Sequence, residues 1–396
     1  MNNPIYLNSL GIINPLGAGK KQVAKNLFSG SQAGMIIRDD LVIDRPLRVG
    51  AVLKDLPAIP SQLKYLDCRN NRLMLAALLE IEDDISQAID RFGAHRIAVV
   101  LGTSTSGISD GEVGVAFKVK TGNFPESYNY TRQEAGSISE FVAAYLKLSG
   151  QALTISTACT SSANALASAR RYINTGFCDA AIVGGADTLC GLTLNGFHSL
   201  EALSSGLCAP FSRNRDGINI GEGAAVFLMS KEKGPVSVLG IGESSDAFHI
   251  SAPDPTGRGA KLSIVRALED AGCQADEVGY INLHGTATLL NDAMESVVVS
   301  DIFKDDVLCS STKPMTGHML GACGANEIAF LWLSLQDEYA KGGLPPHLWD
   351  GAVDEALPTL KFTTMDSQID IQSPLMMSNF FAFGGNNICV LLGEGN

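Results

Sequence analysis

One cysteine of the sequence stands where a nucleophile is expected. Cys159 follows the apolar run ALTIST at 152–157 and precedes a stretch of small residues from Ser161 that has the pattern of an amphipathic helix. A thiol at the start of a helix lies near unpaired backbone N–H groups, which favour its thiolate form. We therefore expect a lowered pKa for Cys159 and a role as a covalent nucleophile. The cysteines without this setting that we assign to packing are Cys178, Cys190, Cys273 and Cys389.

Two of the six histidines follow predicted strands in glycine-rich turns. They are His284 in NLHGTAT and His318 in KPMTGHMLGACGANE. Turns at the carboxyl ends of strands are where α/β proteins form their sites. Either histidine alone would be a buried or loop residue, but two in similar turns indicate a functional site. The zinc patterns HxxxH, CxxC and HExxH are absent, so we expect no metal.

A glycine pair near the end of the sequence has two equally supported interpretations. The segment FFAFGGNN at 380–387 lies between two apolar runs and predicts a hairpin. It is either an ordinary tight turn, or a turn in which Gly384 and Gly385 present N–H groups to an oxyanion. A serine-hydrolase site is not supported, because GTSTSG at 102–107 has Ser106 where GxSxG requires glycine.

The elements around these residues recur in the same order. In each half a helical run leads to a strand and a Gly-Thr turn, then to a second strand with a small-residue helix, and then to a third strand. The first set comprises 69–92, 96–101, 153–157, 161–172 and 180–183, and the second 259–271, 279–283, 307–312, 322–335 and 375–378. The repeat predicts a duplicated α/β protein with a largely parallel sheet and halves at 1–250 and 251–396 that share one site.

Composition excludes several classes of protein. The 396 residues are 45% hydrophobic and 18% charged, which is sufficient for a large core. The formal charge of −13, without a run of five like charges, argues against nonspecific nucleic-acid binding. No signal-peptide pattern and no membrane-spanning apolar run are visible. Nine cysteines without a CxxC pair indicate reduced thiols, and we expect a cytoplasmic protein.

Together, Cys159, His284, His318 and the FGG turn resemble the β-ketoacyl-acyl-carrier-protein synthases, the condensing enzymes of the thiolase superfamily. The similarity extends over the whole chain. Its segments, in family order, are LGIINPLG, TACTSSANAL, PFSRNRDGINIGEGAAVFLM, HGTATLLND, KPMTGHMLGACGANE and NFFAFGGNN. The resemblance implies the α/β thiolase-like fold, a duplicated five-layer αβαβα arrangement that agrees with the repeat.

The resemblance also implies a reaction. Cys159 would accept an acyl group from the phosphopantetheine of an acyl carrier protein, with the backbone N–H groups of Cys159 and Phe383 as the oxyanion hole. His284 and His318 would hydrogen-bond the thioester oxygen of a malonyl group while it loses carbon dioxide. The resulting carbanion would attack the acyl group and lengthen it by two carbons. No cofactor is implied beyond the carrier's phosphopantetheine.

Further roles follow from the same resemblance. Lys313 and Glu327 would act electrostatically, Phe383 would be a gate with Gly384 and Gly385, and Thr286 and Thr288 would bind the pantetheine arm. Thr105 would form a wall of the acyl pocket. Lys64, Arg69 and Arg72 would dock the acidic carrier protein, although each could equally be a solvated helix terminus. The departures from the family pattern are Leu289, Phe380, Ala382, Asn386 and Asn164.

The sequence leaves alternatives open for the function, the assembly and the substrate. A noncatalytic partner subunit of the chain-length-factor type would lack the nucleophile, and a biosynthetic thiolase would have a second catalytic cysteine near its C-terminus. The chain could act as a homodimer, or as the active half of a heterodimer with a chain-length-factor-like homologue, as in type II polyketide and aryl polyene systems. Fatty acid elongation and saturated, polyenoic or aromatic primers are all open.

Overall fold

Strands and helices alternate along the chain in the computed structural model, which describes residues 4–43, 45–304, 306–369 and 375–395. The strands are β1 (Ile5–Asn14), β2 (Gly17–Ala18), β3 (Met35–Arg38), β4 (Leu47–Gly50), β5 (Ile97–Gly102), β6 (Ala152–Ile155), β7 (Ala180–Asp187), β8 (Gly223–Ser230), β9 (Val236–Ser245), β10 (Val278–Asn282), β11 (Leu308–Ser310), β12 (Lys361–Phe362), β13 (Leu375–Phe381) and β14 (Asn386–Glu394). The helices are α1 (Lys20–Phe28), α2 (Arg69–Leu78), α3 (Glu82–Phe92), α4 (Ile108–Thr121), α5 (Ser137–Tyr145), α6 (Ser161–Asn174), α7 (Gly191–Ser199), α8 (Arg258–Ala271), α9 (Leu289–Phe303), α10 (Lys313–Thr316), α11 (Cys323–Ser334) and α12 (Asp337–Ala340).

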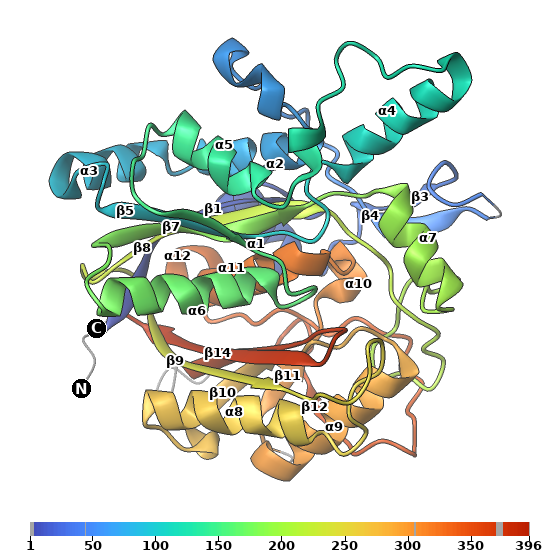
Figure 1. Ribbon diagram of the computed structural model, residues 1–396. Helices are drawn as coiled ribbons and strands as arrows, with labels where there is room; N and C mark the ends of the chain where they lie inside the picture. The colour runs from blue at the N-terminus through green and yellow to red at the C-terminus, as the bar shows by residue number, and fades with distance from the viewer. Residues whose placement is uncertain (1–3, 44, 305, 370–374, 396) are drawn as a thin grey trace.

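The elements form five layers, as predicted (Figure 1). Helices α2, α3 and α5 cover one outer face and α8 and α9 the other, with two sheet layers enclosing α6 and α11 between them. Every residue of α11 is buried, as its position between two sheets requires. The α/β fold class and the five-layer αβαβα arrangement are therefore confirmed.

The strand order shows the predicted duplication directly. The first half runs β1-β8-β7-β5-β6 and the second β9-β14-β13-β10-β11, with antiparallel pairing at the first two steps and parallel pairing at the last two in both. The two halves join where β1 pairs antiparallel with β9. The sheet is therefore mixed, and the prediction of a largely parallel sheet is wrong because two strands of each half pair antiparallel. The corresponding helices α6 and α11 follow β6 and β11, and they pack against each other in the central layer.

Small residues allow the central helices to approach the sheet. A side chain at Gly102, the last residue of β5, would lie 2.3 Å from the backbone nitrogen of Ser162 in α6. A side chain at Gly324 in α11 would lie 2.7 Å from the backbone nitrogen of Ala163. Both distances are shorter than a Cβ atom tolerates, so glycine at 102 lets the start of α6 lie against the carboxyl end of β5, and glycine at 324 lets α11 lie against α6.

The structure has two helices where the sequence predicts one. The run at 69–92 divides into α2 and α3, which are separated by residues 79–81. The carboxylate of Glu80 accepts hydrogen bonds from the backbone N–H groups of Ile12 and Lys20, at 3.0 and 2.8 Å, which fixes this break against β1 and α1. Three acidic residues at 82–84 then favour a new helix N-terminus.

The boundary predicted at residue 250 stays a prediction. β9 ends at Ser245, before that boundary, yet it pairs with β14 of the second half. Among the described residues, no helix combines the length and apolar character needed to cross a membrane.

Candidate active site

Cys159 lies in a sharp turn between β6 and α6. The preceding residue, Ala158, has φ +53°, a left-handed conformation that costs a residue with a Cβ about 1 kcal/mol or more. The hydroxyl of Ser161 stabilises this turn, because it donates to the carbonyl oxygen of Ala158 at 2.6 Å and accepts from the N–H of Thr157 at 2.9 Å. The turn directs the side chain of Cys159 into a cavity, although Cys159 is only 6% exposed.

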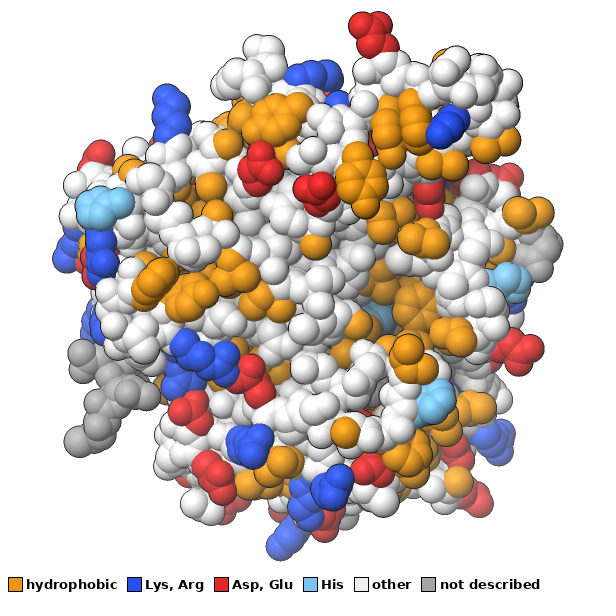
Figure 2. All heavy atoms as spheres, viewed as in Figure 1, with side chains coloured by type: hydrophobic (Ala, Val, Ile, Leu, Met, Phe, Trp, Pro, Cys, Tyr) orange, Lys and Arg blue, Asp and Glu red, His pale blue; other side chains and the backbone are white. Residues whose placement is uncertain are grey.

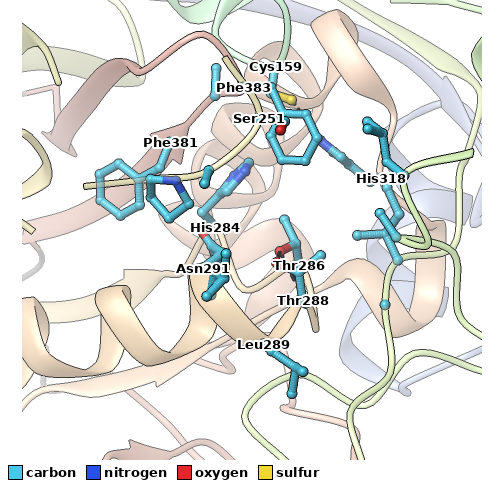
Figure 3. A pocket seen from close by; sticks show the side chains of 18 of the residues that line it. Cys159, Ser251, His284, Thr286, Thr288, Leu289, Asn291, His318, Phe381 and Phe383 are labelled. Atoms are coloured by element: carbon cyan, nitrogen blue, oxygen red, sulfur yellow. Dashed lines mark hydrogen bonds between the residues drawn. The ribbon is translucent and has the colours of Figure 1, made fainter. Parts of the chain in front are cut away.

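The structure brings the three predicted reactive residues together. The Sγ atom of Cys159 lies 3.0 Å from Nε2 of His318. The rings of His284 and His318 meet edge to face with their centroids 5.3 Å apart. All three side chains are at one end of a cavity of about 310 Å³, and Thr286, Thr288 and Leu289 lie further along it (Figure 3).

Burial dominates the electrostatics of the nucleophile. It raises the pKa of Cys159 to about 11, although the backbone N–H of Phe383, the charge of Lys313 and the N–H of Cys159 itself act in the opposite direction. The predicted lowering of this pKa is therefore wrong, because removal of the sulfur from water outweighs the helix N-terminus. With this pKa the thiol is protonated at neutral pH.

The two histidines are neutral as well. Burial, followed by the nearby charge of Lys313, holds the pKa of both His284 and His318 well below the ordinary value. A neutral imidazole carries one N–H donor and one acceptor nitrogen. The two rings can therefore each donate a hydrogen bond to an oxygen in the cavity.

Lys313 and Glu327 form a buried ion pair beside the reactive residues. Their side chains are each 1% exposed, and Nζ of Lys313 lies 2.8 Å from Oε1 of Glu327. Burial disfavours the lysine charge, but Glu327 outweighs it and raises the pKa of Lys313. Lys313 is thus a fixed positive charge that keeps protons off the histidines.

The FGG turn is a hairpin between β13 and β14, as predicted. The N–H of Gly384 donates to the carbonyl oxygen of Ile250 at 2.8 Å, and the N–H of Gly385 donates to that of Ala382 at 3.0 Å. These donors are used within the protein, so the prediction that the glycines present them to an oxyanion is wrong. Their φ values of +89° and +76° show their role, which is to form the turn. The N–H of Phe383 faces the sulfur instead.

The predicted substrate-binding threonines divide into two groups. Thr286 and Thr288 line the cavity, with their hydroxyl oxygens 2.9 Å apart. Thr105 is fully buried outside the cavity lining, where its hydroxyl donates to Oδ1 of Asp187 at 2.7 Å and accepts from the N–H of Thr188 at 3.0 Å. Thr105 is therefore not a wall of this cavity, because its side chain is turned toward Asp187.

The three predicted docking residues are bound to carboxylates. Arg72 donates two hydrogen bonds to Asp67, at 2.6 and 2.8 Å, and Lys64 pairs with the same carboxylate. Arg69 donates to the buried Glu222 at 2.8 and 2.5 Å. None of the three lines the cavity, and their role in docking stays a prediction.

Sequence reasoning missed a buried carboxylate that joins the loops of the site. Oδ1 of Asp187 accepts from the hydroxyl of Thr103 at 2.8 Å, from the N–H groups of Ser104 and Thr105 at 2.8 and 2.7 Å, and from the hydroxyl of Thr105 at 2.7 Å. Oδ2 accepts from the N–H of Ala322 at 3.0 Å. An aspartate at the end of a buried strand, in GGAD, was the available signal.

Asp187 connects the nucleophile with the second histidine. Ser104, held by Asp187, donates its hydroxyl to the carbonyl oxygen of Ala158 at 3.2 Å, directly before Cys159. Ala322, held by the other carboxylate oxygen, follows the loop of His318 and precedes α11. The thiol of Cys323 adds a second link, because it donates to the carbonyl oxygen of Cys159 at 3.1 Å.

Apolar residues at the cavity were also missed. Phe197 and Leu200 line it, and the ring of Phe383 lies 5.6 Å from that of Phe197. Leu289 and Leu290 line it too, each with 60% of its surface exposed. Figure 2 shows hydrophobic side chains around a hollow on this face. Of these residues, only Leu289 and Leu290 had a signal in the sequence, as an apolar pair directly after HGTAT.

The thiolase interpretation fails on position. A biosynthetic thiolase has a second catalytic cysteine near its C-terminus, and Cys389 is the cysteine of this chain closest to the end. Cys389 is fully buried within β14, where its Sγ atom lies 3.2 Å from the hydroxyl oxygen of Ser263. It is not among the residues that line the cavity.

Comparison with known proteins agrees with this geometry. The protein-family model described as "Beta-ketoacyl synthase, N-terminal domain" matches residues 60–234, and the family model described as "Beta-ketoacyl synthase, C-terminal domain" matches residues 236–347. Curated relatives named 3-oxoacyl-(acyl-carrier-protein) synthase 2 are 28% identical in Synechocystis sp., over 97% of this chain and 96% of the relative, and 29% identical in Coxiella burnetii, over 98% of both.

A solved structure is more similar still. A chain in the complex of the ketosynthase ApeO with its chain length factor ApeC, from Xenorhabdus doucetiae, is 46% identical, with a TM-score of 0.94 over 99% of this chain and 98% of that chain. The family models together span more than half of the sequence. The protein therefore belongs to the beta-ketoacyl synthase family, whose members are ketosynthases of the acyltransferase class.

Proposed function

We propose that this ketosynthase condenses an acyl group held on Cys159 with a malonyl group delivered by an acyl carrier protein. The observation that carries the proposal is the position of the Cys159 sulfur, 3.0 Å from His318 Nε2 and faced by the Phe383 N–H in a cavity shared with His284. Both substrates arrive on phosphopantetheine, and no other cofactor is proposed.

The first half-reaction acylates the enzyme. The Cys159 sulfur attacks the thioester carbonyl of the primer, the oxygen of which receives hydrogen bonds from the N–H groups of Phe383 and Cys159. The thiol proton passes to the departing phosphopantetheine sulfur, and His318 Nε2 is within reach to relay it. The thiolate is the nucleophile, so the proton has to leave the sulfur as the new bond forms.

The second half-reaction forms the carbon–carbon bond. The malonyl carboxylate leaves as carbon dioxide, and its electron pair moves onto the thioester oxygen as an enolate that the N–H groups of His284 and His318 stabilise. The enolate carbon attacks the acyl carbonyl, the bond between that carbonyl and the sulfur breaks, and Cys159 leaves as a thiolate that takes up a proton from solvent. Thr286 and Thr288 are placed along the cavity to hold the pantetheine arm.

The acylation experiment tests the assignment of the nucleophile. Cys159→Ala should abolish acyl-enzyme formation and condensation, measured by intact mass spectrometry after incubation with acyl-loaded carrier protein and by product analysis. Cys323→Ala, which changes the neighbouring thiol, is the matched control and should still acquire one acyl group. Acylation that persists in Cys159→Ala would refute the assignment.

We also propose that the chain pairs with a related ketosynthase-like subunit, as the active half of a heterodimer. β6 is an edge strand directly before the nucleophile, and among the described strands only β5 pairs with it. Helix α4 projects from the layers (Figure 1) and carries the exposed apolar residues Val113, Phe117 and Val119. An open strand edge and an exposed apolar helix are features that a partner normally covers.

The similarity to the ApeO–ApeC complex also supports a proposal for the pathway. The 46% identity to a chain of the ApeO–ApeC complex favours a ketosynthase and chain-length-factor pair of a specialised, aryl polyene type over general fatty acid elongation. Co-expression with a chain-length-factor-like homologue should give a heterodimer on size exclusion with mass detection, and a homodimer of full activity alone would refute this assignment. All nine cysteines are free, which supports a cytoplasmic location.

A further inference from the structure

The three reactive side chains are also a set of metal ligands. Sγ of Cys159 and one ring nitrogen each of His284 and His318 all lie within 4.8 Å of one another, and all three residues are buried. They come from turns that are far apart in the sequence, so no compact ligand motif could indicate them. Figure 3 shows the three side chains at the same end of the cavity.

The chemistry of the donors selects the metal. One sulfur and two imidazole nitrogens suit Zn²⁺, whereas Mg²⁺ and Ca²⁺ prefer oxygen ligands. Zinc bonds of about 2.3 Å to sulfur and about 2.0 Å to nitrogen place neighbouring ligands of a tetrahedral site roughly 3.5 Å apart. The observed 3.0 Å between Sγ and His318 Nε2 is close to that spacing, and the His284 nitrogen, which lies within 4.8 Å of both atoms, has to move closer to them where its distance exceeds that spacing.

The surroundings leave room for a fourth ligand. The site opens into the cavity of about 310 Å³, so a water molecule can complete the tetrahedron. Nδ1 of both histidines is buried without a hydrogen-bond partner, which distinguishes the site from structural zinc centres, where a carboxylate or carbonyl orients each histidine. The positive charge of Lys313, partly neutralised by Glu327, also opposes a cation. Both features indicate reversible binding weaker than that of structural zinc.

We propose that the free enzyme binds one Zn²⁺ ion through Cys159, His284 and His318, and that this ion is an inhibitor that competes with the acyl group. On binding, the S–H bond of Cys159 breaks, a zinc–sulfur bond forms and the proton leaves to solvent. The metal occupies the nucleophile and both enolate donors at once. An acylated sulfur cannot be a thiolate ligand, so acyl-enzyme and zinc complex exclude each other.

The binding part rests only on three side chains, while the competition rests on the proposed acylation of Cys159. Zn²⁺ alone is titrated into the full-length, metal-free enzyme by calorimetry, and Cd²⁺ is used as a spectroscopic probe, because its bond to a thiolate gives an ultraviolet charge-transfer band. We expect one ion per chain and a thiolate band. Absence of stoichiometric binding, or a complex without that band, would overturn the proposal.

Matched variants locate the ion. Cys159→Ser and His284→Asn should each weaken Zn²⁺ binding at least tenfold, while Cys273→Ser, at a partly exposed thiol outside the site, should bind as the wild type does. Unchanged affinity in Cys159→Ser, or a loss confined to a control, would place the ion elsewhere and overturn the proposal.

A chemical block avoids dependence on the folding of variants. Wild-type enzyme alkylated at Cys159 by iodoacetamide, verified by peptide mapping, should lose the thiolate band and at least tenfold in Zn²⁺ affinity. Enzyme acylated by a carrier protein should behave in the same way. Zinc binding without any acylation would refute the proposed function but not the metal site, and zinc binding that survives alkylation would refute the metal site alone.

Discussion

At the scale of single residues, the active site keeps its reactive groups neutral and dry. The buried thiol of Cys159 has a pKa of about 11, and the imidazoles beside it have pKa values well below the ordinary range because of burial and Lys313. Charge therefore develops only during the reaction, where fixed donors can stabilise it more in the transition state than before it.

The two half-reactions need different donors, which makes them separable. His318→Ala removes one of the two imidazole donors to the enolate but leaves the N–H groups of Phe383 and Cys159. Decarboxylation of the malonyl thioester should fall about 10²- to 10³-fold, the usual effect of losing one oxyanion donor. Acyl transfer to Cys159 should fall less. Carbon dioxide release and acyl-enzyme mass measure the two steps, and equal losses in both would contradict this division.

At the scale of elements, Asp187 fixes the distance between the nucleophile and the second histidine. One carboxylate oxygen binds the turn that supports Ala158, and the other binds Ala322 at the entrance to α11. The carboxylate can accept on both oxygens, and so it connects elements of both halves of the duplicated fold. An amide could do so on only one side.

This difference makes Asp187→Asn selective. The amide oxygen can still accept the four donors at residues 103–105, but its NH₂ group would face the N–H of Ala322. The His318 loop should shift, so decarboxylation should fall about 10²-fold while acylation of Cys159 is largely kept. Single-turnover assays of both steps check this.

Thr103→Val is the matched control for that variant, because it removes one donor from the same carboxylate at the opposite end. It should lower thermal stability without separating the half-reactions. If Asp187→Asn lowers both steps equally, or if Thr103→Val produces the same separation, Asp187 does not position His318.

At the scale of the whole molecule, the two halves share one interior. Trp332 of the second half donates its indole N–H to the carbonyl oxygen of Leu7 at 3.1 Å, and Asn14 donates to Asn326 at 3.0 Å. α11, which is buried along its whole length, therefore has the first half as one of its walls. The halves resemble two copies of one unit, but neither has a complete core without the other.

Separation of the halves should therefore abolish folding. A fragment of residues 4–234 would expose the α6 surface that α11 covers and the β1 edge that β9 covers. We expect it to lack the cooperative thermal transition of the full chain, measured by calorimetry and circular dichroism. A cooperative transition in the fragment alone would show that the first half is an independent domain.

The acid dependence of stability should contain a contribution from Asp67. Its hydrogen bonds with Arg72, then Lys64, lower the pKa of Asp67 to about 2, although burial acts against them. The unfolded value is about 3.9. A depressed folded pKa gives stability that is present above about pH 4 and is lost as the pH falls toward 2.

Asp67→Asn should remove this contribution. Because Lys64 and Arg72 are partly exposed, we expect a loss of about 1 kcal/mol in the free energy of unfolding at pH 7, which shrinks to about zero near pH 2. Urea denaturation of both proteins at several pH values measures this. A difference that stays constant with pH would show that the ion pairs are not its source.

The reactive residues, and the order of the elements that hold them, are visible in local patterns of the sequence. Cys159 is recognisable because it lies between a strand and a small-residue helix, and His284 and His318 because they lie in glycine-rich turns after strands. The duplication is visible for the same reason, since helix, strand and turn signals depend on residues close together in the chain. The α/β class and the duplication followed from these local signals, whereas the five layers were implied by the family resemblance.

The surroundings of those residues depend on how the chain folds. Burial reversed the expected pKa shift of Cys159, and the carbonyl oxygen of Ile250 accepts the hydrogen bond of the Gly384 N–H. The side chain of Arg69 donates hydrogen bonds to Glu222, and Asp187 accepts hydrogen bonds from two loops that belong to different halves. Burial and hydrogen-bond partners depend on groups that are remote in sequence and meet only when the two sheets close around α6 and α11, so no local pattern encodes them.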